Sequence, residues 1–280
     1  MEELRKSILD AKRIVVKIGT TSITHEETGS LNFAKLEKLV RILVDIRNSG
    51  KQVVLVSSGA IGVGRKALAL KEKPQEKSLK QACAAVGQAR LMMVYQRLFG
   101  EYNQTIAQIL MTKVTLLDDV SRENATGTFR QLLELGIIPI VNENDTVATD
   151  EIEFGDNDSL SAIVAALVDA DLLILLSDIE GLYTDDPNKN PDAKLIDYVE
   201  KIDKKIISMG KGPSTSFGTG GMETKINAAR IATDSGADMV IASGENMSTL
   251  AKVLEGKNVG TIFKAHKNEE FDLIGFVENM

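Results

Sequence analysis

Short apolar runs alternate with longer amphipathic segments along this chain, and that alternation limits its possible folds more than any other feature. The clearest run is 172–176, which consists of five consecutive Leu and Ile residues. An uninterrupted apolar strand suits a parallel sheet covered on both faces, because neither of its faces meets water. Further strands are expected at 13–18, 52–56, 105–110, 137–141, 239–242 and 260–263, the last as a closing edge strand.

The segments between these runs have the spacing of helices. The clearest one follows Asn32, a typical N-cap residue, and ends at Gly50. Its apolar residues at 36, 39, 40, 43 and 46 keep the helical period. Other helices are expected at about 78–99, 121–135, 157–167, 222–235 and 246–254. The alternation predicts an α/β fold with a parallel, doubly wound sheet and crossover helices.

Composition excludes several classes of function. With 280 residues, 43% of them hydrophobic, the chain can build one large α/β domain or two small ones. It has no run of about 18 apolar residues and its N-terminus is charged, so we expect a cytoplasmic protein without a membrane span. The net charge of −7 argues against nucleic acid as a partner. One cysteine excludes an internal disulfide, and two histidines make a His-based zinc site or a Ser-His-Asp triad implausible.

The most polar stretch, 142–158, follows a predicted strand and precedes a predicted helix. Most loops rich in Asp, Glu and Asn are simply solvated, but this one is longer and more charged than solubility requires. Polar residues at 17–21, 57–60 and 177–178 also lie at the ends of predicted strands. Since ligands bind beyond the carboxyl ends of the strands in an open parallel sheet, we favour a binding site there.

Two glycine-rich loops, 58–64 and 218–225, have the features of a loop that binds an oxyanion. Glycine lets backbone N–H groups approach an anion, and the N-terminus of a helix adds its dipole. Neither loop matches G-x-G-x-x-G or the Walker A pattern, and each taken alone is equally compatible with ordinary turn glycines.

Two lysines occupy positions that an anion would explain. Lys225 lies one turn into a predicted helix, where a cation opposes the dipole, and Lys17 lies within an apolar strand. Asp158, at the start of another helix, is a candidate partner for Lys17. Two lysines with glycine loops suit phosphoryl transfer, and nearby carboxylates suit magnesium, which takes few protein ligands beside phosphate. We assign no residue as a metal ligand.

These stretches together resemble the amino-acid kinase superfamily, and within it the glutamate 5-kinase family. The similar stretches come in the family's order, cover about residues 13–264, and are 15–20, 56–60, 142–145, 154–158, 177–187 and 218–225. The pair Asn-Glu-Asn-Asp at 142–145 and Gly-Asp-Asn-Asp at 155–158 is specific to the glutamate 5-kinase branch, whereas 218–225 is shared more widely. Thr21 replaces the usual serine and retains a hydroxyl.

The resemblance implies a three-layer α/β/α sandwich with a mainly parallel open sheet, and ATP-dependent phosphorylation of the γ-carboxylate of L-glutamate in the first step of proline synthesis. Glutamate would be bound over the N-terminal part by Ser58, Asp145 and Asn157. ATP would be bound over about 171–264 by Ser177, Asp178, Thr219, Gly220, Gly221, Met222, Glu223, Thr224 and Lys225, together with Lys17. Lys17 and Lys225 would stabilise the transferring phosphoryl group, and Asp158 would orient both lysines.

The resemblance also implies Mg²⁺ with ATP, a homo-oligomer (dimer or tetramer) and feedback inhibition by proline. We expect a kinase domain over 1–264 and a short tail at 265–280, without the C-terminal RNA-modification-type (PUA) domain of many bacterial members. The main alternative is another superfamily enzyme that acts on acetylglutamate, aspartate or carbamate. A non-catalytic amino-acid sensor is less favoured, because Lys17, Asp158 and Lys225 are all present. A nicotinamide-dependent oxidoreductase is weaker still, since no strand is followed by G-x-G-x-x-G.

Overall fold

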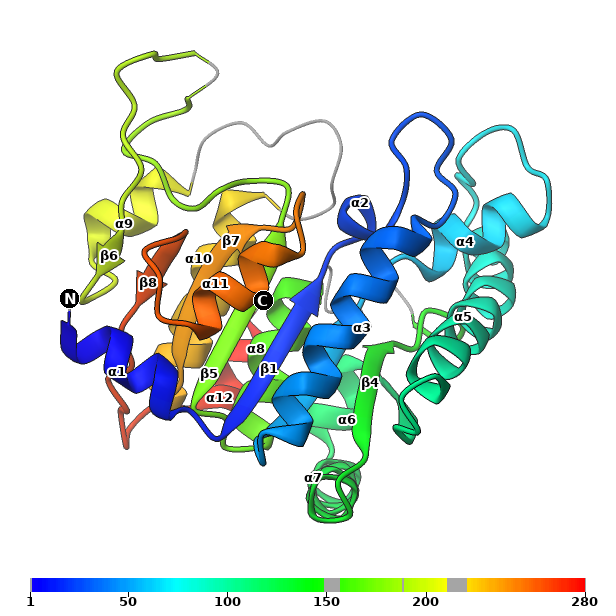
Figure 1. The fold of residues 1–280 in the computed structure, drawn as a ribbon, viewed down its shortest axis with the longest axis horizontal. Coiled ribbons are helices and arrows are strands. Elements are labelled where there is room, and N and C mark those ends of the chain that lie inside the picture. Colours follow the sequence, from blue (N-terminus) through cyan, green and yellow to red (C-terminus); the bar gives the residue numbers. More distant parts are fainter. Residues whose placement is uncertain (1, 149–156, 188, 211–220, 280) are drawn as a thin grey trace. The chain divides into compact units, whose positions relative to one another are not determined.

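The computed structural model describes residues 2–148, 157–187, 189–210 and 221–279. The chain divides into two compact units. We call residues 18–153 the N-terminal unit, and residues 1–17 together with 154–280 the C-terminal unit. Within each unit, strands alternate with helices as the sequence predicts (Figure 1).

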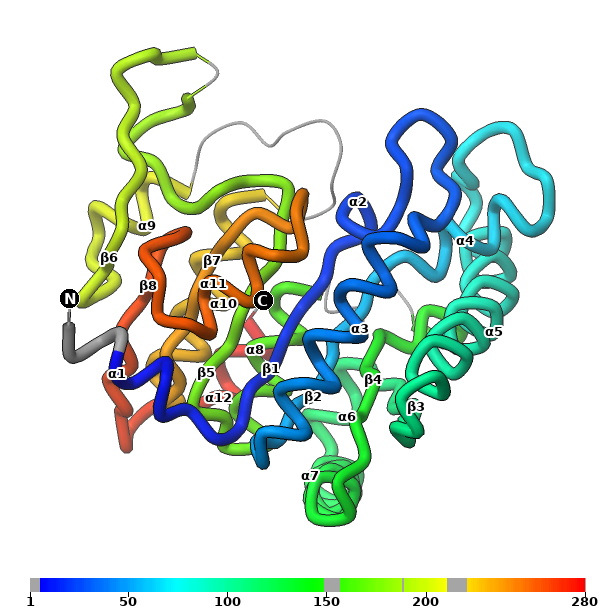
Figure 2. Tube along the Cα trace, viewed as in Figure 1, coloured from blue at the N-terminus to red at the C-terminus, as the bar shows by residue number. Residues whose placement is uncertain are grey.

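The described part of the N-terminal unit has three parallel strands, which are β2 (Gln52–Ser57), β3 (Ile106–Met111) and β4 (Ile138–Glu143). Their order is β3-β4-β2, and all three are labelled in Figure 2. Leu55 pairs with Ile140, and Ile106 pairs with Ile138. Because the strands run in the same direction, their carboxyl ends lie at the same edge.

Helices connect these strands in the N-terminal unit. They are α2 (Thr20–Ile23), α3 (Phe33–Asn48), α4 (Ala60–Ala67), α5 (Lys77–Gly100), α6 (Lys113–Leu117) and α7 (Asp119–Glu134). The predicted cap of α3 is confirmed, since the Asn32 side chain accepts a hydrogen bond from the backbone N–H of Lys35 at 3.0 Å. The predicted apolar positions 36, 39, 40, 43 and 46 are all buried where α3 packs on β2. Each such side chain contributes roughly 1.5–3 kcal/mol by leaving water.

The C-terminal unit contains the strands β1 (Arg13–Ile18), β5 (Leu172–Ser177), β6 (Tyr198–Val199), β7 (Asp238–Ser243) and β8 (Thr261–Phe263). Their order is β1-β5-β7-β8-β6. β5 is buried along its whole length and runs parallel to β7, as the apolar run predicts. β8 runs antiparallel to β7. The prediction that 260–263 is the closing edge strand was wrong, because β6 pairs with the other side of β8. β6 has only two residues, which is too few for a recognisable period.

Helices cover both faces of the strands in the C-terminal unit. They are α1 (Glu2–Asp10), α8 (Asn157–Leu167), α9 (Lys204–Met209), α10 (Met222–Ser235), α11 (Ser248–Leu254) and α12 (Leu273–Glu278). α8 and α10 pack together on one face, and α1 and α11 lie on the other (Figure 1). This arrangement confirms the predicted α/β/α fold class with a mainly parallel sheet.

Candidate active site

Asp158 joins two lysines in the interior of the C-terminal unit. Its Oδ1 atom lies 2.5 Å from Lys17 Nζ, and its Oδ2 atom lies 3.0 Å from Lys225 Nζ. All three side chains are buried, with Asp158 only 1% exposed. The structure therefore brings together the three residues that the sequence singles out for catalysis, although they come from β1, α8 and α10.

The sequence around each of the three residues explains its position. Lys17 is the penultimate residue of β1, so its ammonium group lies near the carboxyl end of that strand. Asp158 is the second residue of α8, where the helix dipole favours a carboxylate. Lys225 is the fourth residue of α10, where the same dipole disfavours a cation. The Asp158 carboxylate lies close enough to compensate this unfavourable position of the Lys225 charge.

The protonation state of Asp158 follows from these contacts. Burial of the carboxyl group raises its pKa, because a charge loses its hydration in the interior. The charges and hydrogen bonds of Lys17 and Lys225 outweigh that penalty, so the pKa lies below its ordinary value. Asp158 is therefore an anion at neutral pH, and it acts as a fixed bridge between the lysines and not as an acid or base.

The N-terminus of α10 forms the next part of the candidate site. Gly221 precedes the helix in an extended conformation and offers no side-chain cap, so the first backbone N–H groups are not capped from that residue. Thr224 Oγ donates a hydrogen bond to the Gly221 carbonyl at 2.8 Å and lies 3.5 Å from Asp158 Oδ2. Met222 and Glu223 belong to the same first turn, whereas Thr219 and Gly220 lie outside the described residues.

Ser177 and Asp178 lie at the carboxyl end of β5 in the same unit. The Ser177 hydroxyl donates to Asp178 Oδ1 at 2.9 Å, and its carbonyl accepts a hydrogen bond from the Gly244 N–H at 2.6 Å. Ser177 pairs with Ser243, the last residue of β7. The predicted ATP-binding residues that are described thus all belong to one unit, at a strand end or at a helix N-terminus.

The predicted glutamate-binding residues divide between the units. Ser58 follows β2 and Asp145 follows β4, and these neighbouring parallel strands end at the same edge of the N-terminal unit. Gly59 turns the chain after Ser58 with φ of 107°, a left-handed conformation that glycine adopts at low cost. Asn157 is the first residue of α8 and belongs to the C-terminal unit.

Two buried polar pairs near Ser58 and Asp145 were missed by the sequence analysis. Asn142 Nδ2 donates to Gln88 Oε1 at 3.0 Å, and the hydroxyl groups of Ser57 and Tyr95 lie 2.8 Å apart. Gln88 and Tyr95 are both on α5, which the sequence identifies as a helix only by its length and composition. Their spacing of seven residues was the available signal.

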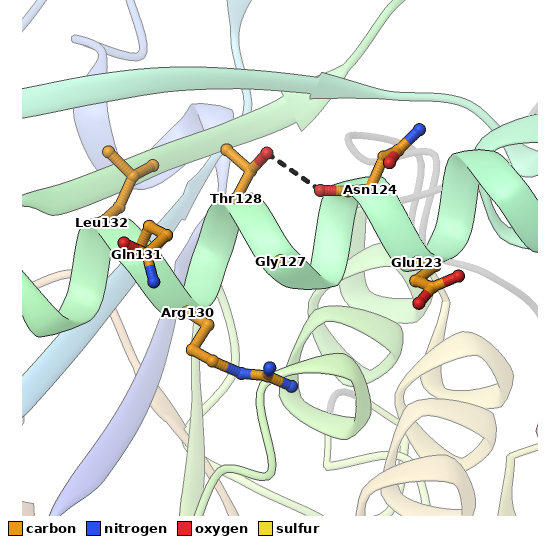
Figure 3. Close-up of a pocket in the computed structure, with 7 residues that line it drawn as sticks. All are labelled: Glu123, Asn124, Gly127, Thr128, Arg130, Gln131 and Leu132. Carbon is orange, nitrogen blue, oxygen red and sulfur yellow. Dashed lines mark hydrogen bonds between the residues drawn. The ribbon is translucent and has the colours of Figure 1, made fainter.

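Three further observations concern the rest of the described residues. A surface hollow of about 500 Å³ runs along α7 (Figure 3), and none of the predicted site residues lines it. No helix in the described part of the chain has the length and apolar character needed to cross a membrane. Among the described residues, no three His, Cys, Asp or Glu side chains cluster as metal ligands, and both oxygens of Asp158 face lysines. The described residues therefore do not form a magnesium cage of their own.

Comparison with known proteins agrees with this geometry. Residues 12–243 match the model of the amino acid kinase family. A protein of Clostridium tetani named glutamate 5-kinase is 55% identical over 268 residues, which cover 95% of this chain and 100% of that protein. A protein of the same name from Clostridium perfringens is 51% identical over 270 residues, with the same coverage.

Solved structures of more distant proteins share the fold. UMP kinase from Bacillus anthracis superposes with a TM-score of 0.62 at 15% identity, covering 91% of this chain and 96% of that one. UMP kinase from Ureaplasma parvum gives 0.64 at 17% identity, covering 90% and 98%. At such low identity the likeness concerns the fold alone. The family match spans most of the chain and includes Lys17 and Asp158, so this chain belongs to the amino acid kinase family.

Proposed function

We propose that this chain is a glutamate 5-kinase, which transfers the γ-phosphoryl group of ATP to the γ-carboxylate of L-glutamate in the first step of proline biosynthesis. The structural observation that carries the proposal is the buried Asp158 bridge between Lys17 and Lys225. The two proteins of that name, 55% and 51% identical over almost the whole chain, support the choice of substrate.

The chemistry needs little from the protein beyond charge and position. A free γ-carboxylate has a pKa of about 4.3 and is ionised at neutral pH, so no general base is required. One of its oxygens attacks the γ-phosphorus, the bond from that phosphorus to the β,γ-bridging oxygen breaks, and ADP leaves with the bonding electrons. The barrier is the repulsion between two anions, and the ammonium groups of Lys17 and Lys225 reduce it.

Asp158 acts on this reaction through the lysines. It holds one ammonium group on each of its oxygens, so both charges stay in place without reorganisation when the phosphoryl group moves. Lys17 and Lys225 would contact the phosphoryl group, whereas Asp158 would orient them. The N-terminus of α10 and the residues Ser177 and Asp178 would hold the rest of the nucleotide, the former through backbone N–H groups and the helix dipole. Mg²⁺ would be bound together with ATP, through phosphate oxygens and water with few protein ligands, and would neutralise part of the phosphate charge.

The amino acid would be held by complementary charge and hydrogen bonds. Asp145 suits the α-ammonium group, and Ser58 with the Gly59 N–H suits a carboxylate. Asn157 offers an amide that can both donate and accept. Binding of proline as a feedback inhibitor and assembly into a homo-oligomer are part of the same proposal, and both are measurable on the purified chain by inhibition and by sedimentation.

A substrate panel tests the proposal directly. The purified chain is incubated with Mg·ATP and each acid in turn (glutamate, acetylglutamate, aspartate and carbamate), and any acyl phosphate is trapped with hydroxylamine. We expect ADP release and hydroxamate with glutamate only. Turnover of aspartate or acetylglutamate without glutamate would instead identify a different member of the family. Binding of glutamate without any ADP release would favour the amino-acid sensor.

A further inference from the structure

One face of α5 carries a row of polar side chains with a regular spacing. Gln81, Gln88 and Tyr95 are seven residues apart, which is close to two helical turns, so they share one side of the helix. Each makes a hydrogen bond away from the helix. Gln81 Nε2 donates to the Ala148 carbonyl at 3.1 Å, Gln88 Oε1 accepts from Asn142 at 3.0 Å, and Tyr95 bonds Ser57 at 2.8 Å. We call these three residues the α5 polar row.

The partners of the α5 polar row surround the proposed glutamate contacts. Ser57 directly precedes Ser58 in the sequence. Asn142 and Ala148 lie three residues before and three residues after Asp145. One helix therefore bonds the strand end that leads to Ser58 and both sides of the loop that carries Asp145. All of these residues belong to the N-terminal unit.

Burial makes two of these bonds expensive to lose. Tyr95 and Ser57 are at most 1% exposed, and Gln88 and Asn142 are at most 8% exposed. Ser57 Oγ also donates to the Ser58 carbonyl at 3.3 Å, so its hydroxyl group has a second partner. Water cannot readily replace a buried partner on α5, so loss of either bond would leave the strand end or the loop less firmly held. Such a shift would weaken the hydrogen bonds that Ser58 or Asp145 would make with the amino acid, because hydrogen bonds depend steeply on distance and angle.

Close packing keeps α5 in place beside α4. A Cβ atom at Gly87 would lie 1.7 Å from the Ala60 carbonyl, and one at Gly64 would lie 1.8 Å from the Cys83 carbonyl. The two helix backbones thus touch with no room for a side chain. Because α4 begins directly after Ser58 and Gly59, this contact ties the α5 polar row to the turn that carries Ser58.

We propose that α5 is the positioning element of the glutamate site. The α5 polar row sets the affinity for the amino acid by holding the segments after β2 and β4, which carry Ser58 and Asp145, in fixed positions. Gln81, Gln88 and Tyr95 are positioning residues, which act through Ser58 and Asp145 and touch neither the substrate nor the phosphoryl group. The inference rests on the proposed function, because it needs glutamate as the ligand of those loops.

The test compares Tyr95→Phe and Gln88→Met with a matched control, Gln104→Met. Gln104 is likewise a hydrogen-bonded glutamine, whose Nε2 donates to the backbone carbonyls of Thr105 at 2.8 Å and Gly136 at 3.0 Å. It lies before β3, at the opposite end of the strands from the proposed glutamate contacts. We expect each row variant to raise the glutamate KM about fivefold or more, as loss of a buried hydrogen bond would. The ATP KM and kcat should stay within about twofold in both row variants. The control should leave all three constants unchanged.

A second measurement separates positioning from loss of folding. Ser57→Ala, Tyr95→Phe and their combination are compared for glutamate KM and melting temperature. If the pair acts through its mutual hydrogen bond, the double variant should have no higher KM than the worse single variant. An equal rise of the glutamate KM and the ATP KM would overturn the inference. So would a KM change that merely follows the melting temperature and appears equally in Gln104→Met.

The outcome for the parent chain keeps the two proposals apart. If the parent phosphorylates glutamate and the row variants retain its KM, only the role of the α5 polar row is refuted. If the parent does not turn over glutamate at all, the proposed function fails and the inference falls with it.

Discussion

Asp158 lies between the ammonium groups of Lys17 and Lys225, and removal of its charge would leave two buried cations facing each other. Breaking a buried ion pair by removing one partner costs more than the pair contributes when intact, because the remaining charge has lost its water. At the residue scale we therefore expect this one carboxylate to support both the stability of the fold and the placement of the proposed catalytic ammonium groups.

We expect Asp158→Asn to lower the free energy of unfolding by about 3–5 kcal/mol, the range for uncompensated buried charges. Urea denaturation followed by circular dichroism measures this change. Asp119→Asn is the matched control, because Asp119 pairs with Arg122 on an exposed surface and should contribute little. A variant of Asp158 that unfolds at the same urea concentration as the parent would contradict the buried bridge.

Lys225→Ala should reduce kcat for glutamate phosphorylation by about a hundredfold or more, with a small change in glutamate KM. The reason is that its charge acts on the phosphoryl group as charge develops there and not on the bound amino acid. Initial rates at saturating ATP separate the two constants. Lys252→Ala, on the exposed side of α11, serves as the control for loss of one surface charge. Near-normal kcat in Lys225→Ala would remove it from the catalytic residues.

At the scale of whole elements, the two glycines at the α4–α5 contact differ from other helical glycines. Gly87 has a neighbouring backbone carbonyl where a Cβ would be, whereas a Cβ at Gly127 in α7 would have nothing within 4 Å. Gly127 lies along the surface hollow shown in Figure 3, next to the turn where Thr128 bonds the Asn124 carbonyl. The same substitution should thus have opposite effects at the two sites.

Gly127→Ala should raise the free energy of unfolding by roughly 0.5–1 kcal/mol, because alanine loses less backbone entropy in a helix. Gly87→Ala should lower it, since the added methyl group forces α4 and α5 apart. Paired thermal melts of the two variants and the parent test both signs together. A stabilised Gly87→Ala protein would mean that the two helices do not touch as described.

At the scale of the whole molecule, buried ionisable groups predict how stability changes with pH. Burial raises the pKa of Tyr95 to about 12, with the hydrogen bond from Ser57 opposing this in part. The contribution of Tyr95 to the free energy of unfolding is therefore complete below the pKa of an unfolded tyrosine, about 10, and is lost as the pH rises through 12. Asp158 has the opposite sign. Because its pKa is lowered in the folded protein, its contribution to the free energy of unfolding is complete above the ordinary aspartate pKa of 3.8. That contribution is lost as the pH falls below this value.

Removal of the Tyr95 hydroxyl group tests how stability changes at alkaline pH. The free energy of unfolding of the parent, taken relative to that of Tyr95→Phe, should fall by roughly 2 kcal/mol between pH 10 and pH 12, since two pKa units separate the folded and unfolded tyrosine. Ser57→Ala keeps the phenol and should retain the alkaline slope of the parent. Parallel slopes for the parent and Tyr95→Phe would show that Tyr95 does not titrate in this range.

The sequence by itself determined most of the long elements and the kinds of residue at the candidate site. The apolar run 172–176 and the period of α3 are local properties, because strand and helix preferences depend on neighbours within a few residues. The cost of burying Lys17 in a strand also called for an anionic partner, for which Asp158 was the candidate. The glycine loop 218–225 was recognised as a motif, but 211–220 lies outside the described residues.

Only the tertiary structure decided which distant residues meet. Residues far apart in the chain meet in three places. They set the order of β6, β7 and β8, they form the 3.0 Å contact of Lys225 with Asp158, and they bond Gln88 and Tyr95 to two strands. No local pattern encodes such contacts, because they depend on how buried surfaces and unpaired polar groups are satisfied together once the elements pack. The sequence named the lysines and the carboxylate, and packing brought each ammonium group to within 3.0 Å of that carboxylate.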